Sequence, residues 1–146
     1  MFLSGTVLLR ATRPGKVYVA NEEGASVSVI DLQGTLKTLS IDLSGSCKMM
    51  MAHNVQVTPD GKSVWVTAVP MDSIGINQLV GIDANTGTIK NRAQLGKDLH
   101  VAHVVLDNKS KYAFVTAKES NQVMQVDANT YEVVKKFDFG AGHSPH

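Results

Sequence analysis

Short hydrophobic runs alternate with polar, turn-forming residues along this chain, and the pattern recurs about three times. Each copy holds one apolar run, a turn, and a second apolar run that ends in Asp. The paired runs are Val17–Asn21 with Val27–Asp31, Val64–Ala68 with Leu79–Asp83, and Ala113–Ala117 with Val123–Asp127. A repeat of roughly fifty residues built from short apolar strands is typical of a β-propeller blade.

Each full copy predicts four strands, because its apolar runs are rich in Val, Ile, Phe and Tyr, which suit a packed, pleated surface. The strands of the middle copy are expected near Val55–Thr58, Ser63–Ala68, Leu79–Asp83 and Ile89–Leu95. Those of the last copy are expected near Val101–Leu106, Tyr112–Ala117, Gln122–Asp127 and Val133–Phe139. The predicted fold class is all-β: an incomplete β-propeller of about three four-stranded antiparallel blades.

The turns between these strands carry recognisable chemistry. Thr58–Lys62 predicts a tight turn, since Pro59 presets φ and Gly61 tolerates a positive φ. In the matching segment Asp107–Lys111, Asn108 is the residue expected to take the left-handed conformation. The aspartates that close the third strand of each copy recur at one repeat position, which favours a turn-stabilising role over acid–base catalysis. They are Asp31, Asp83 and Asp127.

The repeat also divides the chain. Residues 16–50, 51–98 and 99–140 form successive copies, and residues 141–146 match the start of another, so 16–146 is expected to be one partial propeller. Residues 1–15 are expected to be an N-terminal tail or a residual signal segment. No intact signal peptide is predicted, because no basic region comes before the apolar residues. The first copy lacks an innermost strand unless this segment supplies it.

Composition narrows the function classes. The net charge is +1 without a basic stripe, which argues against nucleic-acid binding. No apolar run reaches the roughly 20 residues that span a bilayer. Cys47 is the only cysteine, so no intrachain disulfide can form. Open sheets at both ends of the stack predict either a fragment of a larger propeller or self-association through the terminal blades.

All the histidines fall where a segment leads into the innermost strand of a copy. They are His53 in the middle copy, His100 and His103 in the last copy, and His143 and His146 at the start of the next. Such segments converge on the central channel of a propeller. Imidazoles there could bind copper, zinc or a haem iron, or an anion when protonated. Soft sulfur from Cys47, Met49, Met50 and Met51 lies in the same zone and would suit copper.

A plain polar channel lining is the alternative. Residues three apart on a straight strand face opposite sides, so a His-x-x-His pair cannot present both rings together unless one lies before the strand. His103 also aligns with Asn54 rather than with His53, and a slip of one residue reverses the face unless a bulge restores it. Met50, Met51 and Trp65 are expected to serve packing. The sequence holds no nucleophile elbow, phosphate loop or dinucleotide fingerprint.

The runs Val17–Asn21 and Val27–Asp31, the turn Val57–Lys62 and the terminal Ser144–His146 resemble the YVTN family of β-propeller repeats. The resemblance implies a larger propeller, secreted or periplasmic, that binds a small ligand or a protein without catalysis and serves as a binding module or scaffold. Its alternative implication is part of a metal- or haem-binding redox propeller, similar to the cytochrome d1 domain or nitrous oxide reductase, with channel-lining histidines and with copper or haem in the full-length parent. Surface-layer adhesion proteins carry similar repeats, which leaves that role open as well.

Overall fold

The structure is a computed structural model that describes residues 15–32, 36–40 and 50–146. These residues form strands, turns and loops, and no helix occurs among them. Nearly all of the predicted N-terminal tail, together with Cys47 and Met49, falls outside the described residues. The strands are β1 (Lys16–Asn21), β2 (Ser26–Asp31), β3 (Leu36–Ser40), β4 (Met50–Val57), β5 (Ser63–Pro70), β6 (Asn77–Asp83), β7 (Ile89–Gly96), β8 (Val101–Leu106), β9 (Tyr112–Ala117), β10 (Gln122–Asp127) and β11 (Val133–Asp138).

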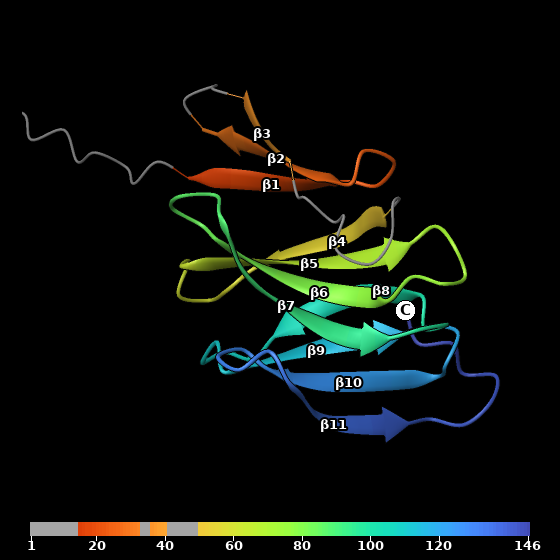
Figure 1. Ribbon diagram of the computed structural model, residues 1–146. Helices are drawn as coiled ribbons and strands as arrows, with labels where there is room; N and C mark the ends of the chain where they lie inside the picture. Colours follow the sequence, from red (N-terminus) through yellow and green to blue (C-terminus); the bar gives the residue numbers. More distant parts are fainter. Residues whose placement is uncertain (1–14, 33–35, 41–49) are drawn as a thin grey trace, which may run out of the picture.

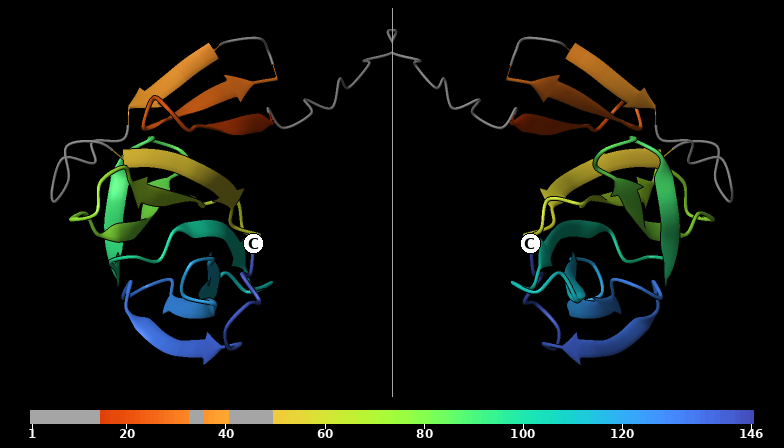
Figure 2. Two further views of the ribbon diagram at one scale, coloured as in Figure 1. Left: turned by 90° about the vertical axis from the view of Figure 1, so that its right-hand side faces the viewer. Right: turned by 90° about the vertical axis from the view of Figure 1, so that its left-hand side faces the viewer.

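The strands form three antiparallel sheets in which each strand pairs with its neighbour along the chain (Figure 1). We call them blade 1 (β1–β3), blade 2 (β4–β7) and blade 3 (β8–β11). The blades stack face to face, and the inner strands β4 and β8 lie against each other (Figure 2). The prediction of an all-β partial propeller is therefore confirmed. Blade 1 has three described strands, and the residues that would supply its innermost strand, if the N-terminal segment does so, fall outside the described ones.

Alternation along each strand creates the two inter-blade cores. Val64, Val66 and Val80 face blade 1 and pack with Val27. The residues next to them in sequence, Trp65 and Leu79, face blade 3 and join a second core. Because blade 2 is covered on both faces, β5 and β6 are buried along almost their whole length. The period-two pattern thus specifies both faces of this blade.

Trp65 is the largest fully buried side chain of the second core, and its predicted packing role is confirmed. Its ring is 1% exposed and stacks on Tyr131 of blade 3 at a centroid distance of 4.8 Å. Gly81 pairs with Trp65 across the sheet, and a Cβ there would collide with the Tyr131 ring. The glycine is needed because the aromatic ring of the next blade occupies the space of a side chain.

The turns show how the repeat tolerates substitution. Gly61 has a φ of 69°, as its turn predicts. In the matching turn Ser110, at the place of Gly61, has a φ of 56°. The prediction that Asn108 takes the left-handed conformation is wrong, because the turn geometry requires it at the fourth position. Asp107 stabilises this turn in the absence of Pro and Gly, since its carboxylate accepts hydrogen bonds from Lys111 N and Tyr112 N at 2.6 and 2.8 Å.

Most strand boundaries match their predictions, and β8, β9 and β10 match at both ends. The clear error is β4, which was predicted near Val55–Thr58 and begins at Met50. His53 therefore lies inside the strand and does not begin it. The alternation is broken by a β-bulge, because Ala52 pairs with Ala68 while Asn54 pairs with Thr67. One extra residue in the strand hides the period of two from sequence reasoning.

Candidate functional site

Four imidazoles gather at the inner strands, and we call them the axial histidine cluster: His53, His100, His103 and His146. The His53 ring lies 5.8 Å from His100, 6.1 Å from His103 and 5.9 Å from His146. The His103 and His146 rings are 4.6 Å apart. The cluster draws on β4, the residues around the start of β8, and the C-terminal segment, whose end lies beside these strands in Figures 1 and 2.

Matching bulges aim two of these side chains. His53 is the extra residue of β4, and Ala102 and His103 together face Thr116 in β8, where the register also shifts. Each bulge leaves a backbone N–H to satisfy, and a threonine hydroxyl accepts it: Asn54 N reaches Thr67 Oγ1 and His103 N reaches Thr116 Oγ1, both at 2.9 Å. A bulge redirects a side chain that would otherwise follow the strand alternation.

The same residues join the inner ends of blades 2 and 3. Thr67 Oγ1 donates to Ala102 O at 2.8 Å, and Asn54 Oδ1 accepts from Val104 N at 3.1 Å. Asn77 adds a third link, since its Oδ1 accepts from Val101 N at 3.2 Å. These hydrogen bonds fix β8 relative to three strands of blade 2, so the histidines of the two blades are held at a defined separation.

His53 has two distinct ring nitrogens. Its Nε2 lies 4.0 Å from Oε1 of Glu22, in the turn of blade 1 between β1 and β2. Its Nδ1 is buried and has no hydrogen-bond partner among the described residues. Burial, opposed by the Glu22 charge and aided by the three neighbouring imidazoles, lowers the pKa of His53 below 6.5. His53 is therefore neutral at pH 7, and an imidazole lone pair is available.

His100 has a similar carboxylate neighbour. It precedes β8 with a φ of 44°, and its Nδ1 lies 3.9 Å from Oε1 of Glu119 in the turn between β9 and β10. Both residues line a hollow of about 270 Å³ between blades 2 and 3. The prediction that one member of the His100/His103 pair lies before the strand is confirmed, and these two rings do not contact each other in the described part of the chain.

Not every predicted site residue joins the cluster. His143 is exposed and has no ring contact with the other histidines in the described ranges. Met50 is 2% exposed and packs into the core between blades 1 and 2, while Met51 packs against the other core. Glu22 and Glu119 were missed, because a carboxylate in a surface turn carries no signal of the ring it faces. As the side chains stand, no three His, Cys, Asp or Glu residues within 15–32, 36–40 and 50–146 are arranged to hold a metal ion.

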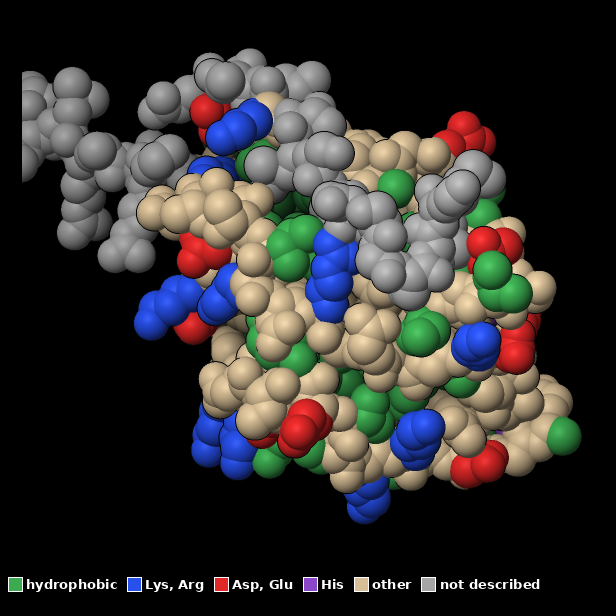
Figure 3. Space-filling model, viewed as in Figure 1, with side chains coloured by type: hydrophobic (Ala, Val, Ile, Leu, Met, Phe, Trp, Pro, Cys, Tyr) green, Lys and Arg blue, Asp and Glu red, His purple; other side chains and the backbone are tan. Residues whose placement is uncertain are grey.

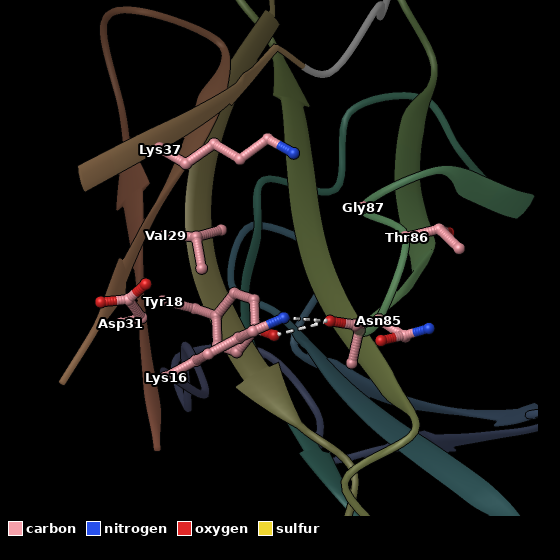
Figure 4. A pocket seen from close by; sticks show the side chains of 9 residues that line it. Lys16, Tyr18, Val29, Asp31, Lys37, Asn85, Thr86 and Gly87 are labelled. Carbon is pink, nitrogen blue, oxygen red and sulfur yellow. Dashed lines mark hydrogen bonds between the residues drawn. The ribbon is translucent and has the colours of Figure 1, made fainter. Parts of the chain in front are cut away.

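A second hollow, of about 230 Å³, lies between blades 1 and 2 (Figure 4). Lys16 Nζ and Tyr18 Oη both donate to Ala84 O, at 3.1 and 3.2 Å. Burial and the Asp83 charge raise the pKa of Tyr18 above 10.0, so its hydroxyl stays protonated as a donor. These polar groups are engaged in joining the two blades.

The aspartates with lowered pKa values serve turns. Asp83 Oδ1 accepts from Asn85 N and Thr86 N, and Asp127 Oδ1 accepts from Asn129 N and Thr130 N. These backbone bonds hold the pKa of each carboxyl below 3.8. The turn-stabilising role predicted for Asp83 and Asp127 is confirmed.

The surface is mixed in character. On the face shown in Figure 3, side chains of both charges are interspersed with hydrophobic ones. No helix long and apolar enough to cross a membrane occurs among the described residues.

Comparison with known proteins agrees with this architecture. Residues 5–140 match the protein family described as Lactonase, 7-bladed beta-propeller. No curated protein matches the chain.

Several solved structures share the fold. The catalytically inactive H270A virginiamycin B lyase from Staphylococcus aureus with quinupristin superposes with a TM-score of 0.69 at 15% identity, over 90% of this chain and 40% of that one. The dihydro-heme d1 dehydrogenase NirN in complex with DHE gives 0.64 at 20% identity, over 84% and 27%. AztD from Citrobacter koseri gives 0.61 at 15% identity, over 86% and 33%. This chain thus spans well under half the length of these proteins, and at such identities the likeness concerns the fold.

Proposed function

We propose that this chain, which belongs to the family of seven-bladed lactonase β-propellers, forms part of a propeller that binds a ligand at the axial histidine cluster without catalysis. The resemblance to YVTN repeats supports a periplasmic or extracellular setting. The proposal extends to the whole propeller, of which this chain resembles a part.

The observation that carries the proposal is the convergence of four imidazoles from separate segments of the chain. His53, His100 and His103 are half-buried and His146 is exposed, so the cluster lies where a ligand can reach it from solvent. The buried Nδ1 of His53 has no partner in the described structure, and such a group costs about 1–3 kcal/mol unless something binds it.

The hydrogen bonds and neighbours of the carboxylates favour ligand binding over catalysis. Acid–base catalysis needs two groups whose environments push their pKa values apart. Here the lowered pKa values of Asp83 and Asp127 arise from hydrogen bonds within their own turns. Glu22 and Glu119 each face one histidine at the edge of the cluster, which suits orientation of a ring.

The test is ligand-dependent stabilisation of the purified chain. Thermal melts are recorded with Zn²⁺, inorganic phosphate and haemin as three probes of different chemistry. At least one probe is expected to raise the Tm of the wild type, since a ligand that binds only the folded state stabilises it by mass action. The shift should be lost in the His53→Ala/His103→Ala double variant.

The matched control is His143→Ala, which removes an exposed imidazole of the same C-terminal segment that has no contact with the cluster rings. It should keep the shift of the wild type. No shift with any probe, or an equal shift in the double variant, contradicts the proposal. Hydrolysis of a δ-lactone by the wild type that the double variant lacks would show a catalytic site instead.

A further inference from the structure

We propose that His53, His103 and His146 together bind a single transition-metal ion, Zn²⁺ or Cu²⁺, with Glu22 orienting His53. The inference rests on the proposed function and names the ligand class of the same site. It concerns three of the four clustered rings, because these three contact one another pairwise.

The separations of the three rings suit a shared ion. Their centroids lie 6.1, 5.9 and 4.6 Å apart. Imidazoles that bind one zinc at about 2.0–2.1 Å have ring centres about 5 Å apart, from the tetrahedral angle between the bonds. His100 contacts His53 alone among the cluster rings, so it lies outside this triangle.

The two nitrogens of His53 are placed as in a metal-binding histidine. A ligating imidazole usually turns its other N–H toward a carboxylate, which fixes its tautomer and raises its basicity. Nε2 of His53 faces Glu22 Oε1 at 4.0 Å, while Nδ1 is buried and unpartnered in the described structure. A proton on Nε2 leaves the Nδ1 lone pair for an ion.

The donor set selects the class of metal. Neutral imidazoles suit Zn²⁺ and Cu²⁺, whereas Mg²⁺ and Ca²⁺ need oxygen ligands. Met50 and Met51 pack into the cores, so thioether sulfur does not enter the set. Three protein ligands leave a fourth position open, as in zinc sites that bind a further molecule.

Binding requires the rings to turn. In their present orientations, no three such side chains of the described residues are arranged to hold an ion. The bulges in β4 and β8 already set the backbone, and the hydrogen bonds of Thr67 and Asn54 hold the two strands together. We expect the His53 and His103 rings to reach the ion by rotation about their side-chain torsions, while His146 is brought in by the C-terminal segment that follows β11.

The experiment is calorimetric titration of the chelator-treated full chain with Zn²⁺ and, separately, with Cu²⁺. One equivalent is expected to bind to the wild type. The affinity should fall at least tenfold in His53→Ala and in His103→Ala, while His143→Ala should match the wild type. Glu22→Gln should bind ten- to a hundredfold more weakly, as when the outer partner of a ligand is lost.

A second readout separates this site from metal held elsewhere on the surface. Tetrahedral Co²⁺ gives strong visible absorption bands, and these should appear in the wild type and in His143→Ala but not in His103→Gln. Circular dichroism of each variant checks that its sheets remain folded. Absence of binding, or an affinity of His53→Ala and His103→Ala equal to that of the wild type, overturns the inference.

The outcomes also separate the inference from the proposed function. If phosphate or haemin stabilises the wild type through the cluster while Zn²⁺ and Cu²⁺ do not bind, the binding function holds and the metal is rejected. If no probe and no metal binds, both are rejected.

Discussion

Tyr131 packs at the junction of blades 2 and 3 although its backbone has a positive φ, which is unfavourable for a bulky residue. Its φ is 63°, at the place where the matching turn of blade 2 has Gly87 at 74°. A bulky residue is strained there, at a cost of about 1–3 kcal/mol. The ring lies over Gly81 and stacks on Trp65, so the strain is offset by burial of two aromatic side chains.

Gly81→Ala should therefore destabilise the protein by about 1–3 kcal/mol, because the new Cβ meets the Tyr131 ring. The measurement is the free energy of unfolding by denaturant. The same substitution in a Tyr131→Ala background should cost much less, since the ring in contact is gone. Additive effects of the two changes would contradict this account of the junction.

At the scale of strands, the paired bulges in β4 and β8 set the geometry of the histidines. Each bulge presents an unpaired N–H that a threonine of the next strand accepts. Thr67 does more than Thr116, since it also donates to Ala102 O in the neighbouring blade and is fully buried. One hydroxyl thus completes a bulge and joins two blades.

Thr67→Val keeps the shape of the side chain and removes both hydrogen bonds. It should lower the free energy of unfolding by about 1–3 kcal/mol, because Asn54 N and Ala102 O are left buried without these partners. Thr116→Val is the matched control: its hydroxyl accepts one bond from His103 N, and it should cost about half as much. Equal costs would mean that the link between blades adds nothing.

The sequence predicts the bounds of a strand correctly where apolar and polar residues alternate without interruption. β9 and β10 match their predictions, because their residues alternate strictly and an Asp-containing turn comes before β9 and another follows β10. β4 was predicted five residues too short at its start, because the bulge at His53 interrupts the alternation. The convergence of histidines followed from their places in the repeat. Which rings meet did not, since bulges decide the direction of His53 and His103, and Glu22 comes from another blade.

At the scale of the whole molecule, equivalent apolar positions of the repeat are buried in blade 2 and exposed in blade 1. Val17, Val19 and Ile30 on blade 1 are 46, 41 and 37% exposed. Their counterparts in the repeat are buried by blade 1 itself: Val64, Val66 and Ile82. The same apolar pattern is thus covered in one blade and open in the other, and we expect the open face to be a contact surface for a further sheet.

We expect the chain to self-associate through this face at high concentration. Light scattering after size-exclusion chromatography should show a mass that rises with concentration. Replacing both exposed valines, Val17→Lys and Val19→Lys, should reduce that rise, because charges oppose burial in an apolar contact. Ile74→Lys, in an exposed loop between β5 and β6, should leave it unchanged. A single mass at every concentration would contradict the expectation.

The sandwiched position of blade 2 has a consequence for motion. In a linear array each unit is stabilised by its neighbours, so opening begins at the ends and reaches the middle last. The amide hydrogens of β5 and β6, buried on both faces, are then the slowest to exchange with deuterated solvent, while those of β11 exchange early. His53 on β4 borders the slow region, whereas His103 lies on β8 of the outer blade 3. The distance between these two imidazoles therefore stays fixed only while β8 remains bound to blade 2.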